Sequence, residues 1–252
     1  MYITTQGLIL RETNYKEADK ILTVLTREFG KRTVKARGCR RKTSKLTAGT
    51  QLLVYSDMTL YERQERYLLH EVAVLEQFWG LRRDIVLLAL ASYFAEVLEA
   101  VAQEGVPHPE LLSLILNSMY ALDTLGKPPR QVKAVFELSL MCLAGYEPRV
   151  DACAVCGVEN PAAPCLNLRE GVLHCATCRA QVGDGVSLPL TPAVLLALRH
   201  VAWGEAKRLF SFTLPPAGLL QFSDVTEAFF LTQLERGFRT LDYYKQLTPE
   251  EL

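Results

Sequence analysis

The pattern of hydrophobic and polar positions divides the 252-residue chain into a β-type first part and a helical remainder. Up to about residue 80, short runs rich in branched residues alternate apolar and polar positions, the period of a strand with one buried face. In the clearest run, Leu52, Val54, Met58 and Leu60 alternate with residues that face the other way. Gly30 can take the positive φ that a tight hairpin needs. The expected strands are Gly7–Leu10, Ile21–Thr26, Thr33–Lys35, Leu52–Tyr61 and Tyr67–Leu75.

After residue 80 the apolar period changes to that of a helix. Asp84 and Thr191 can cap helices, and Pro192 suits a first helical position. Gly126, Gly145 and Gly204 are placed to end helices. The expected helices run from Asp84 to about Gln103, Pro109–Leu125, Pro129–Ala144, Thr191 to near Gly204, and Ser223 or Asp224 to about Phe238.

These elements predict an α+β fold with an N-terminal OB-type β-barrel, because five short strands suit a small closed barrel. A generic β-rich domain is the alternative. We expect the barrel over residues 1–80 and a helical domain over residues 81–150 and 190–252. A cysteine-rich insertion at residues 151–189 holds too few apolar residues to fold unaided.

The chain has no feature that predicts export or membrane insertion. Met1–Leu10 lacks the basic start and apolar stretch of a secretory signal. The longest nearly uncharged run, Ile85–Ala95, is shorter than the roughly 20 residues of a membrane span. We therefore expect a soluble, cytoplasmic protein.

The formal net charge is zero, but the charge is distributed unevenly. Residues 1–50 hold twelve Lys or Arg against four acidic residues, so the rest of the chain is acidic. Eight of these cations lie within fifteen residues that contain no acid: Lys31, Arg32, Lys35, Arg37, Arg40, Arg41, Lys42 and Lys45. A solvated surface usually mixes both signs, so an all-positive strand and loop favours a phosphate ligand over the alternative of a merely solvated loop.

Aromatic residues in the same region can stack on the bases of a single strand. They are Tyr2, Tyr15, Phe29, Tyr55, Tyr61 and Tyr67. No feature of the basic run reads base identity, so we expect little sequence preference and a steep salt dependence.

Four of the seven cysteines form two C-x-x-C pairs separated by eighteen residues, namely Cys153, Cys156, Cys175 and Cys178. This spacing predicts a structural zinc site, because two tight turns can direct four thiolates at one ion. A redox pair, a catalytic zinc and replacement of Cys175 by His174 are weaker alternatives, since four sulfurs leave no position for water. We expect Cys142 to be a core residue and Cys165 to pack within the insertion. Cys39, whose thiolate the adjacent arginines would favour, has no assigned role.

Common catalytic motifs are missing from the chain. No phosphate loop, dinucleotide fingerprint, nucleophile elbow or H-E-x-x-H occurs. The histidines at positions 70, 108, 174 and 200 are scattered, and no carboxylate pair stands out. We expect a binding protein and no enzyme.

The order of these features resembles the bacterial RecO family of recombination mediators. The resemblance rests on Gly7-Leu8-Ile9-Leu10, on Glu17 to Leu22, on Gly30 and Ala36 to Arg41, and on Leu143 to Pro148 followed by Cys153-x-x-Cys156. It implies an OB fold, a helical domain and an embedded zinc module, although some relatives lack the cysteines.

The resemblance also implies a function in DNA repair of the RecF type. Members bind single- and double-stranded DNA, pair with RecR and engage the C-terminal tail of single-stranded-DNA-binding protein (SSB). They anneal strands and help RecA loading on gaps, which implies a nucleoid-associated location. The sequence leaves two alternatives open: an RNA- or ribosome-associated protein with the same OB fold and zinc module, and a zinc-dependent enzyme that processes nucleic acid.

Overall fold

The computed structural model describes residues 1–64 and 66–248. Its strands are β1 (Tyr2–Tyr15), β2 (Asp19–Thr26), β3 (Gly30–Ala36), β4 (Tyr55–Arg63), β5 (Arg66–Glu76), β6 (Pro164–Asn167), β7 (Val172–Cys175) and β8 (Ser187–Pro189). Its α-helices are α1 (Trp79–Arg83), α2 (Ile85–Val101), α3 (Pro109–Asp123), α4 (Pro129–Leu143), α5 (Pro192–Trp203), α6 (Pro216–Leu234) and α7 (Arg239–Leu247). Short 3-10 turns cover Ala48–Thr50, Ala176–Gln181 and Ala206–Arg208.

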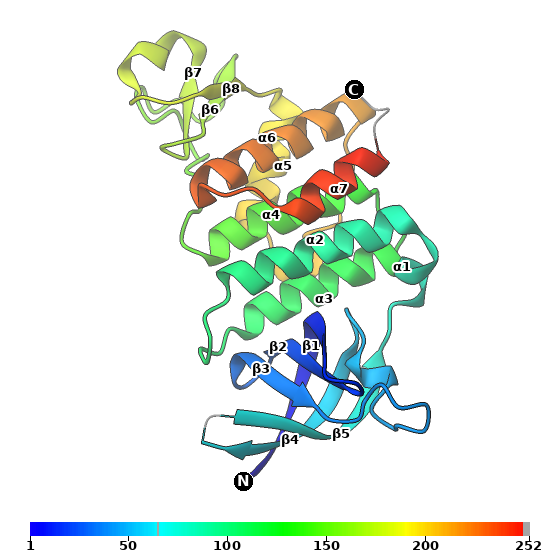
Figure 1. Cartoon of the computed structure of the whole chain (residues 1–252). Coiled ribbons are helices and arrows are strands. Elements are labelled where there is room, and N and C mark those ends of the chain that lie inside the picture. Colours follow the sequence, from blue (N-terminus) through cyan, green and yellow to red (C-terminus); the bar gives the residue numbers. More distant parts are fainter. Residues whose placement is uncertain (65, 249–252) are drawn as a thin grey trace. The chain divides into compact units, whose positions relative to one another are not determined.

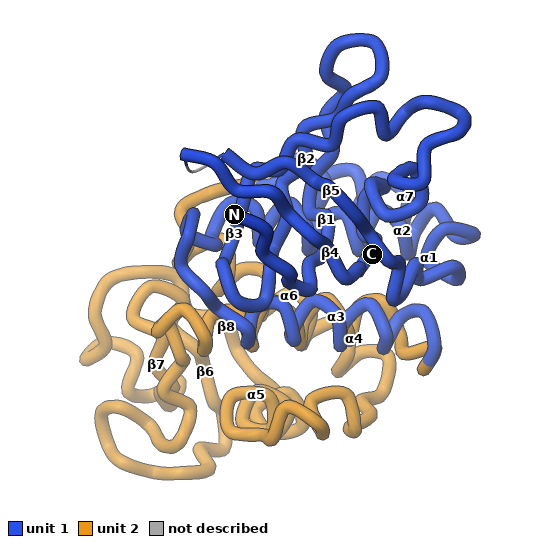
Figure 2. The backbone as a smooth tube through the Cα atoms, turned by 90° about the horizontal axis from the view of Figure 1, so that it is seen from below, with its two compact units in different colours: residues 1–124, 238–252 blue, residues 125–237 orange. Residues whose placement is uncertain are grey.

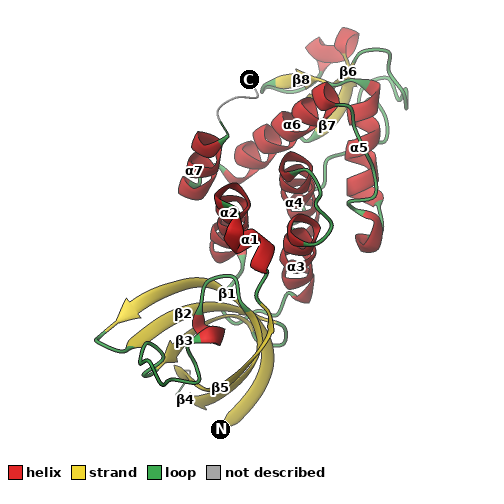
Figure 3. Cartoon of the chain, turned by 90° about the vertical axis from the view of Figure 1, so that its right-hand side faces the viewer, coloured by secondary structure: helices red, strands yellow, loops and turns green. Residues whose placement is uncertain are grey.

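The first five strands form a closed barrel in the order β1-β2-β3-β5-β4, as Figures 1 and 3 show. The barrel closes through a short parallel pairing of β3 with β5, in which Val34 lies opposite Tyr67. Its core holds fully buried side chains such as Leu22, Val34 and Met58. The predicted OB-type barrel and the α+β class are therefore confirmed.

Strand β1 is much longer than the expected Gly7–Leu10, because barrel closure makes it pair with both β2 and β4. A register shift between Ile9 and Arg11 bends the strand as it passes from one partner to the other. A Cβ atom on Gly7 would lie 2.7 Å from Val24 Cγ1, so only glycine permits this approach of β1 to β2.

The expected strand Leu52–Tyr61 was wrong at its start. Leu53 has a φ of +61°, a left-handed conformation that a regular strand does not allow. Its backbone N–H donates to Ile9 O at 2.9 Å, and its side chain is buried in place of Leu52. The strand consequently begins at Tyr55, after which Met58 and Leu60 point into the core as expected.

Most helix ends agree with the capping residues. Asp84 accepts hydrogen bonds from the backbone N–H groups of Val86 and Leu87, and Thr191 accepts one from Val194. Gly126 and Gly145 have positive φ after α3 and α4. The sequence did not predict α1, which is only five residues long.

The last expected helix was wrong at both ends. Helix α6 begins at Pro216 instead of Ser223 or Asp224, because proline fits the first helical turn, where its missing N–H is not needed. It ends at Leu234, since Glu235 takes a left-handed conformation with a φ of +50°. The chain then forms α7, a short and mostly polar helix whose buried residues are Leu241 and Tyr244. The sequence did not predict this helix.

The chain forms two compact units, coloured separately in Figure 2: residues 1–124 with 238–252, and residues 125–237. In the first, α2 contacts β1 of the barrel as well as α7. In the second, α4, α5 and α6 pack together, and the cysteine-rich segment adds a three-stranded sheet in the order β7-β6-β8. Within the described residues, no helix has the length and apolar character needed to cross a bilayer.

Candidate nucleic-acid interface and metal centre

Two of the eight predicted phosphate-binding cations pack against the helical part of their own unit. Lys31 Nζ donates to Glu99 O at 2.7 Å, near the end of α2 where the helix dipole favours a cation. The guanidinium of Arg32 lies 5.1 Å from the ring centre of Tyr67 and close to the backbone of Gly105. Both side chains are thus held at the start of β3, on its helix-facing end.

The loop that follows β3 is anchored at both ends. Cys39 is only 1% exposed and belongs to the barrel core, although arginines flank it in the sequence. Arg40 N donates to Ala18 O at 3.0 Å, and Thr47 Oγ1 donates to Cys39 O at 2.7 Å. With Cys39 turned inward, the exposed cations of the loop are Arg40, Arg41, Lys42 and Lys45.

Asp19 positions the junction between β3 and this loop. Gly38 N donates to Asp19 Oδ1 at 2.8 Å, and this bond, aided by nearby Lys35, lowers the pKa of the carboxyl below its ordinary value. Lys35 Nζ lies 3.3 Å from Asp19 Oδ2 and 4.7 Å from the ring centre of Tyr15. Lys35 is therefore positioned by an acid, whereas Arg37 next along the outer face is exposed.

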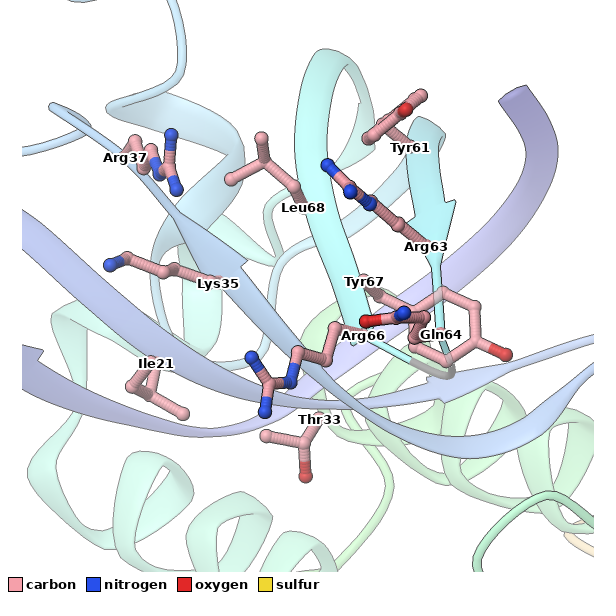
Figure 4. A pocket seen from close by; sticks show the side chains of 10 residues that line it. All are labelled: Ile21, Thr33, Lys35, Arg37, Tyr61, Arg63, Gln64, Arg66, Tyr67 and Leu68. Carbon is pink, nitrogen blue, oxygen red and sulfur yellow. The ribbon is translucent and has the colours of Figure 1, made fainter. Parts of the chain in front are cut away.

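A cavity of about 660 Å³ opens on the barrel between β3 and the β4–β5 hairpin (Figure 4). Its cations come from two separate segments: Lys35 and Arg37 from β3 and its end, and Arg63 and Arg66 from the hairpin. The other lining residues are Ile21, Thr33, Tyr61, Gln64, Tyr67 and Leu68. The structure thus joins part of the basic run to a second basic segment about thirty residues later.

Sequence reasoning missed Arg63, Gln64 and Arg66, which it assigned only to a charged turn. Arg63 and Arg66 are opposite each other in the register of β4 and β5, and Gln64 takes the positive φ of +51° that a tight hairpin turn requires. One feature of the sequence could have identified these residues: two arginines flank a two-residue turn between two expected strands.

In the second unit, the four paired cysteines come together. Their sulfur atoms all lie within 4.8 Å of one another (Cys153, Cys156, Cys175 and Cys178). A tetrahedral ion at about 2.3 Å from each sulfur needs sulfur–sulfur distances of about 3.8 Å, so small side-chain adjustments suffice. Gly157 has a φ of +72° and donates to Cys153 O at 2.9 Å, which forms the tight turn expected after the first pair. The donor set fits a metal ion.

Backbone groups around the cluster favour a thiolate. Burial opposes ionisation of Cys153, but backbone N–H groups directed at its sulfur, among them that of Cys175 at 3.3 Å, lower its pKa to about 6. The hydrogen bond with Cys156 raises the pKa of Cys175 to about 12, because a first thiolate makes the next one costly in the absence of a cation. A bound metal ion would offset that repulsion.

His174 has no place in this ligand set. It is fully buried, its Nδ1 lies 2.8 Å from Cys175 O, and its Nε2 lies 2.9 Å from Ser187 Oγ. Both ring nitrogens therefore have partners other than the cysteine sulfurs. Of the unpaired cysteines, Cys165 is half-buried on β6, within the insertion as expected. Cys142 was expected in the core but is only half-buried, and burial raises its pKa to about 12.

Arg199 on α5 ties the first cysteine turn to the helices of its unit. Its Nε donates to Val150 O at 2.7 Å, and its Nη2 donates to Asp151 O at 2.8 Å and to Glu159 O. Its Nη1 donates to Asn160 Oδ1 at 2.8 Å. The rigid guanidinium thus joins both ends of the segment 150–160 to one helix.

We expect Arg199→Lys to loosen this segment, because an ammonium group cannot reproduce the forked geometry. The expected loss is about 1–3 kcal/mol of local stability. Hydrogen–deuterium exchange should become faster at residues 151–160, while Arg208→Lys, at an exposed position, should leave it unchanged. Unaltered exchange in Arg199→Lys would contradict this anchoring role.

Comparison with known families agrees with this architecture. A family model described as "Recombination protein O N terminal" matches residues 1–78, and one described as "Recombination protein O C terminal" matches residues 82–242. The chain belongs to the RecO family. The predicted family membership is therefore confirmed, and the two matches cover most of this RecO chain.

Relatives that are similar over most of the chain carry the same family name. The DNA repair protein RecO of Acetivibrio thermocellus is 31% identical over 246 residues, which cover 98% of this chain and 97% of the relative. That of Caldicellulosiruptor bescii is 26% identical over 96% of this chain and 98% of its own length. That of Listeria innocua is 34% identical over 77% of this chain and 75% of its own length.

Proposed function

We propose that this RecO-family protein is a non-enzymatic DNA-binding mediator of recombinational repair. Its barrel holds single- and double-stranded DNA through phosphate contacts, and it anneals complementary strands. With RecR and the SSB tail it helps RecA load onto SSB-coated gaps. The helical part, with the cysteine cluster holding a structural zinc ion, provides the scaffold for partner contacts.

One observation carries the DNA-binding proposal: most of the exposed cations of the barrel gather on one continuous stretch of chain and on the neighbouring hairpin. The proposed contact residues are Lys35, Arg37, Arg40, Arg41, Lys42 and Lys45 of the predicted set, together with Arg63 and Arg66. Arginine can chelate a phosphate with two donors, and unmixed positive charge is favourable only with an anionic ligand nearby. Lys31 and Arg32 contribute charge while packing against α2 and Tyr67.

The alternatives weighed from the sequence have less support. The relatives are named as DNA repair proteins, which favours DNA over RNA or the ribosome as the ligand. Four sulfur ligands would close the coordination sphere of zinc, which favours a structural ion over a catalytic one. Zinc is proposed because paired C-x-x-C thiolates suit its tetrahedral preference.

We expect the triple variant Arg37→Ala, Arg40→Ala, Arg41→Ala to bind unrelated DNA sequences at least about tenfold more weakly at physiological salt. The slope of log K against log salt concentration should fall by about three, roughly one for each lost phosphate contact. Fluorescence anisotropy titrations over a salt series measure both quantities. Unchanged affinity and slope would contradict the proposed surface.

An annealing assay tests the wider function. The unaltered protein should pair complementary strands that are coated with SSB, and the triple variant should do so more slowly. Competition by matched RNA and DNA strands separates the DNA proposal from the RNA alternative. Equal annealing by the triple variant would show that this surface does not carry the activity.

A further inference from the structure

The cavity between β3 and the β4–β5 hairpin combines cations with apolar and aromatic side chains. A surface that binds only phosphates would not need the apolar and aromatic groups. Four cations line the cavity, and no acidic side chain is among its described lining residues. Figure 4 shows the Arg63 and Arg66 side chains reaching from the hairpin toward β3. A ligand inside the cavity therefore meets positive charge from two sides.

Apolar and aromatic groups complete the lining. Ile21 and Leu68 are half-buried, and Tyr61 is 36% exposed, with its ring 5.2 Å from that of Tyr2. Tyr67 is 9% exposed and already contacts the Arg32 guanidinium. Tyr61 is consequently the aromatic side chain available for stacking, and Tyr67 forms part of the wall.

The size of the cavity limits what it can hold. At about 660 Å³ it lies within the range of about 300–1,000 Å³ that is typical of small-molecule pockets. A duplex keeps its bases stacked inside the helix, so it offers only phosphates to such a pocket. A single strand can offer an unstacked base together with its phosphate.

We propose that this cavity binds one unpaired nucleotide of single-stranded DNA. The phosphate contacts Arg37, Arg63 and Arg66, and the base stacks against Tyr61. This inference rests on the proposed DNA-binding function and deepens it, because it assigns selectivity for single strands to the cavity. The loop cations Arg40 and Arg41 contact the backbone of either form.

The test compares a single-stranded oligo(dT), a blunt duplex of mixed sequence and an abasic single strand by anisotropy. Tyr61→Ala should lower affinity for oligo(dT) by about tenfold, the scale of one lost base stack, and should change affinity for the duplex by less than about twofold. The double variant Arg63→Ala, Arg66→Ala should weaken binding of both oligo(dT) and duplex, because it removes two phosphate contacts. Tyr61→Ala should not weaken binding of the abasic strand, because that strand has no base to stack.

Two variants serve as controls. Tyr61→Phe keeps the ring and should bind oligo(dT) as the unaltered protein does, even if Tyr61→Ala proves unstable. Arg27→Ala removes one positive charge from an exposed position in the turn between β2 and β3 and should leave the preference for oligo(dT) over duplex unchanged.

The outcomes separate this inference from the proposed function. Equal losses on oligo(dT) and duplex in Tyr61→Ala, or no loss on either, would overturn the nucleotide pocket and leave DNA binding in place. Failure of the unaltered protein to bind any of the three ligands would overturn the proposed function itself.

Discussion

Replacing Lys133 by Met should destabilise the unit formed by residues 125–237 by about 3–5 kcal/mol. Lys133 is 2% exposed and lies on α4, where its Nζ is 3.1 Å from Glu137 Oε1 and 2.7 Å from Glu227 Oε2 of α6. Removing the ammonium group takes away the buried cation that contacts both carboxylates, and Glu137 is fully buried. Such a loss is a large part of the 5–15 kcal/mol that stabilises a typical domain.

The same ion pairs predict a dependence on pH. Burial lowers the pKa of Lys133, but the charges of Glu137 and Glu227 more than offset this effect, so its pKa is raised overall. A raised pKa in the folded state means that the stabilisation is fully present below the unfolded value of about 10.4. It is lost as the pH rises through the higher pKa of the folded protein, and Lys133→Met should remove this alkaline dependence.

Urea unfolding measures both effects. Trp79 lies in the first unit and Trp203 in the second, so a Trp79→Phe background leaves Trp203 as the reporter of residues 125–237. Lys207→Met changes the same residue type at an exposed site and should alter stability by less than about 0.5 kcal/mol. A Lys133→Met protein that unfolds at the unaltered midpoint would contradict the argument.

The second large effect is expected from Cys153→Ala, which should abolish stoichiometric metal binding and unfold the cysteine-rich segment. In small zinc modules the metal contributes about 10–16 kcal/mol of apparent binding free energy, which is also their folding free energy. Cys153 is the most buried of the four ligands, and its sulfur accepts backbone N–H groups, so its loss removes the best-positioned thiolate. Treatment with a chelator should have the same effect on the unaltered protein.

Metal analysis and limited proteolysis within residues 151–189 check this result. Cys142→Ala lies outside the cluster and should retain one metal ion per chain. DNA binding should persist in Cys153→Ala, since the proposed DNA surface belongs to the other compact unit. Full metal retention by Cys153→Ala would remove that residue from the ligand set.

Features that depend on residues close together in the chain could be predicted from the sequence. The caps at Asp84 and Thr191 act within one helical turn, and their hydrogen bonds form as expected. The two C-x-x-C pairs predicted which four cysteines come together, because each tight turn presents its own two sulfurs. Alternation of apolar residues predicted the barrel strands. It did not predict the positive φ at Leu53, because of which β4 begins only at Tyr55.

Burial and side-chain direction could not be predicted in the same way. Lys133 and Glu137 have the spacing of an ordinary exposed ion pair on a helix, and only the packing of α6 against α4 buries them beside Glu227. Cys39 stands among arginines in the sequence, but its side chain lies in the barrel core.

By itself, the sequence determined the class of this protein: a five-stranded barrel with a basic strand and loop, followed by helices and a four-cysteine cluster. Only the tertiary structure decided which cations are exposed. It directs Lys31 and Arg32 to packing contacts and brings Arg63 and Arg66 to the cavity beside β3. The physical reason is that barrel closure through the β3–β5 pairing joins segments about thirty residues apart, and no local pattern encodes that pairing.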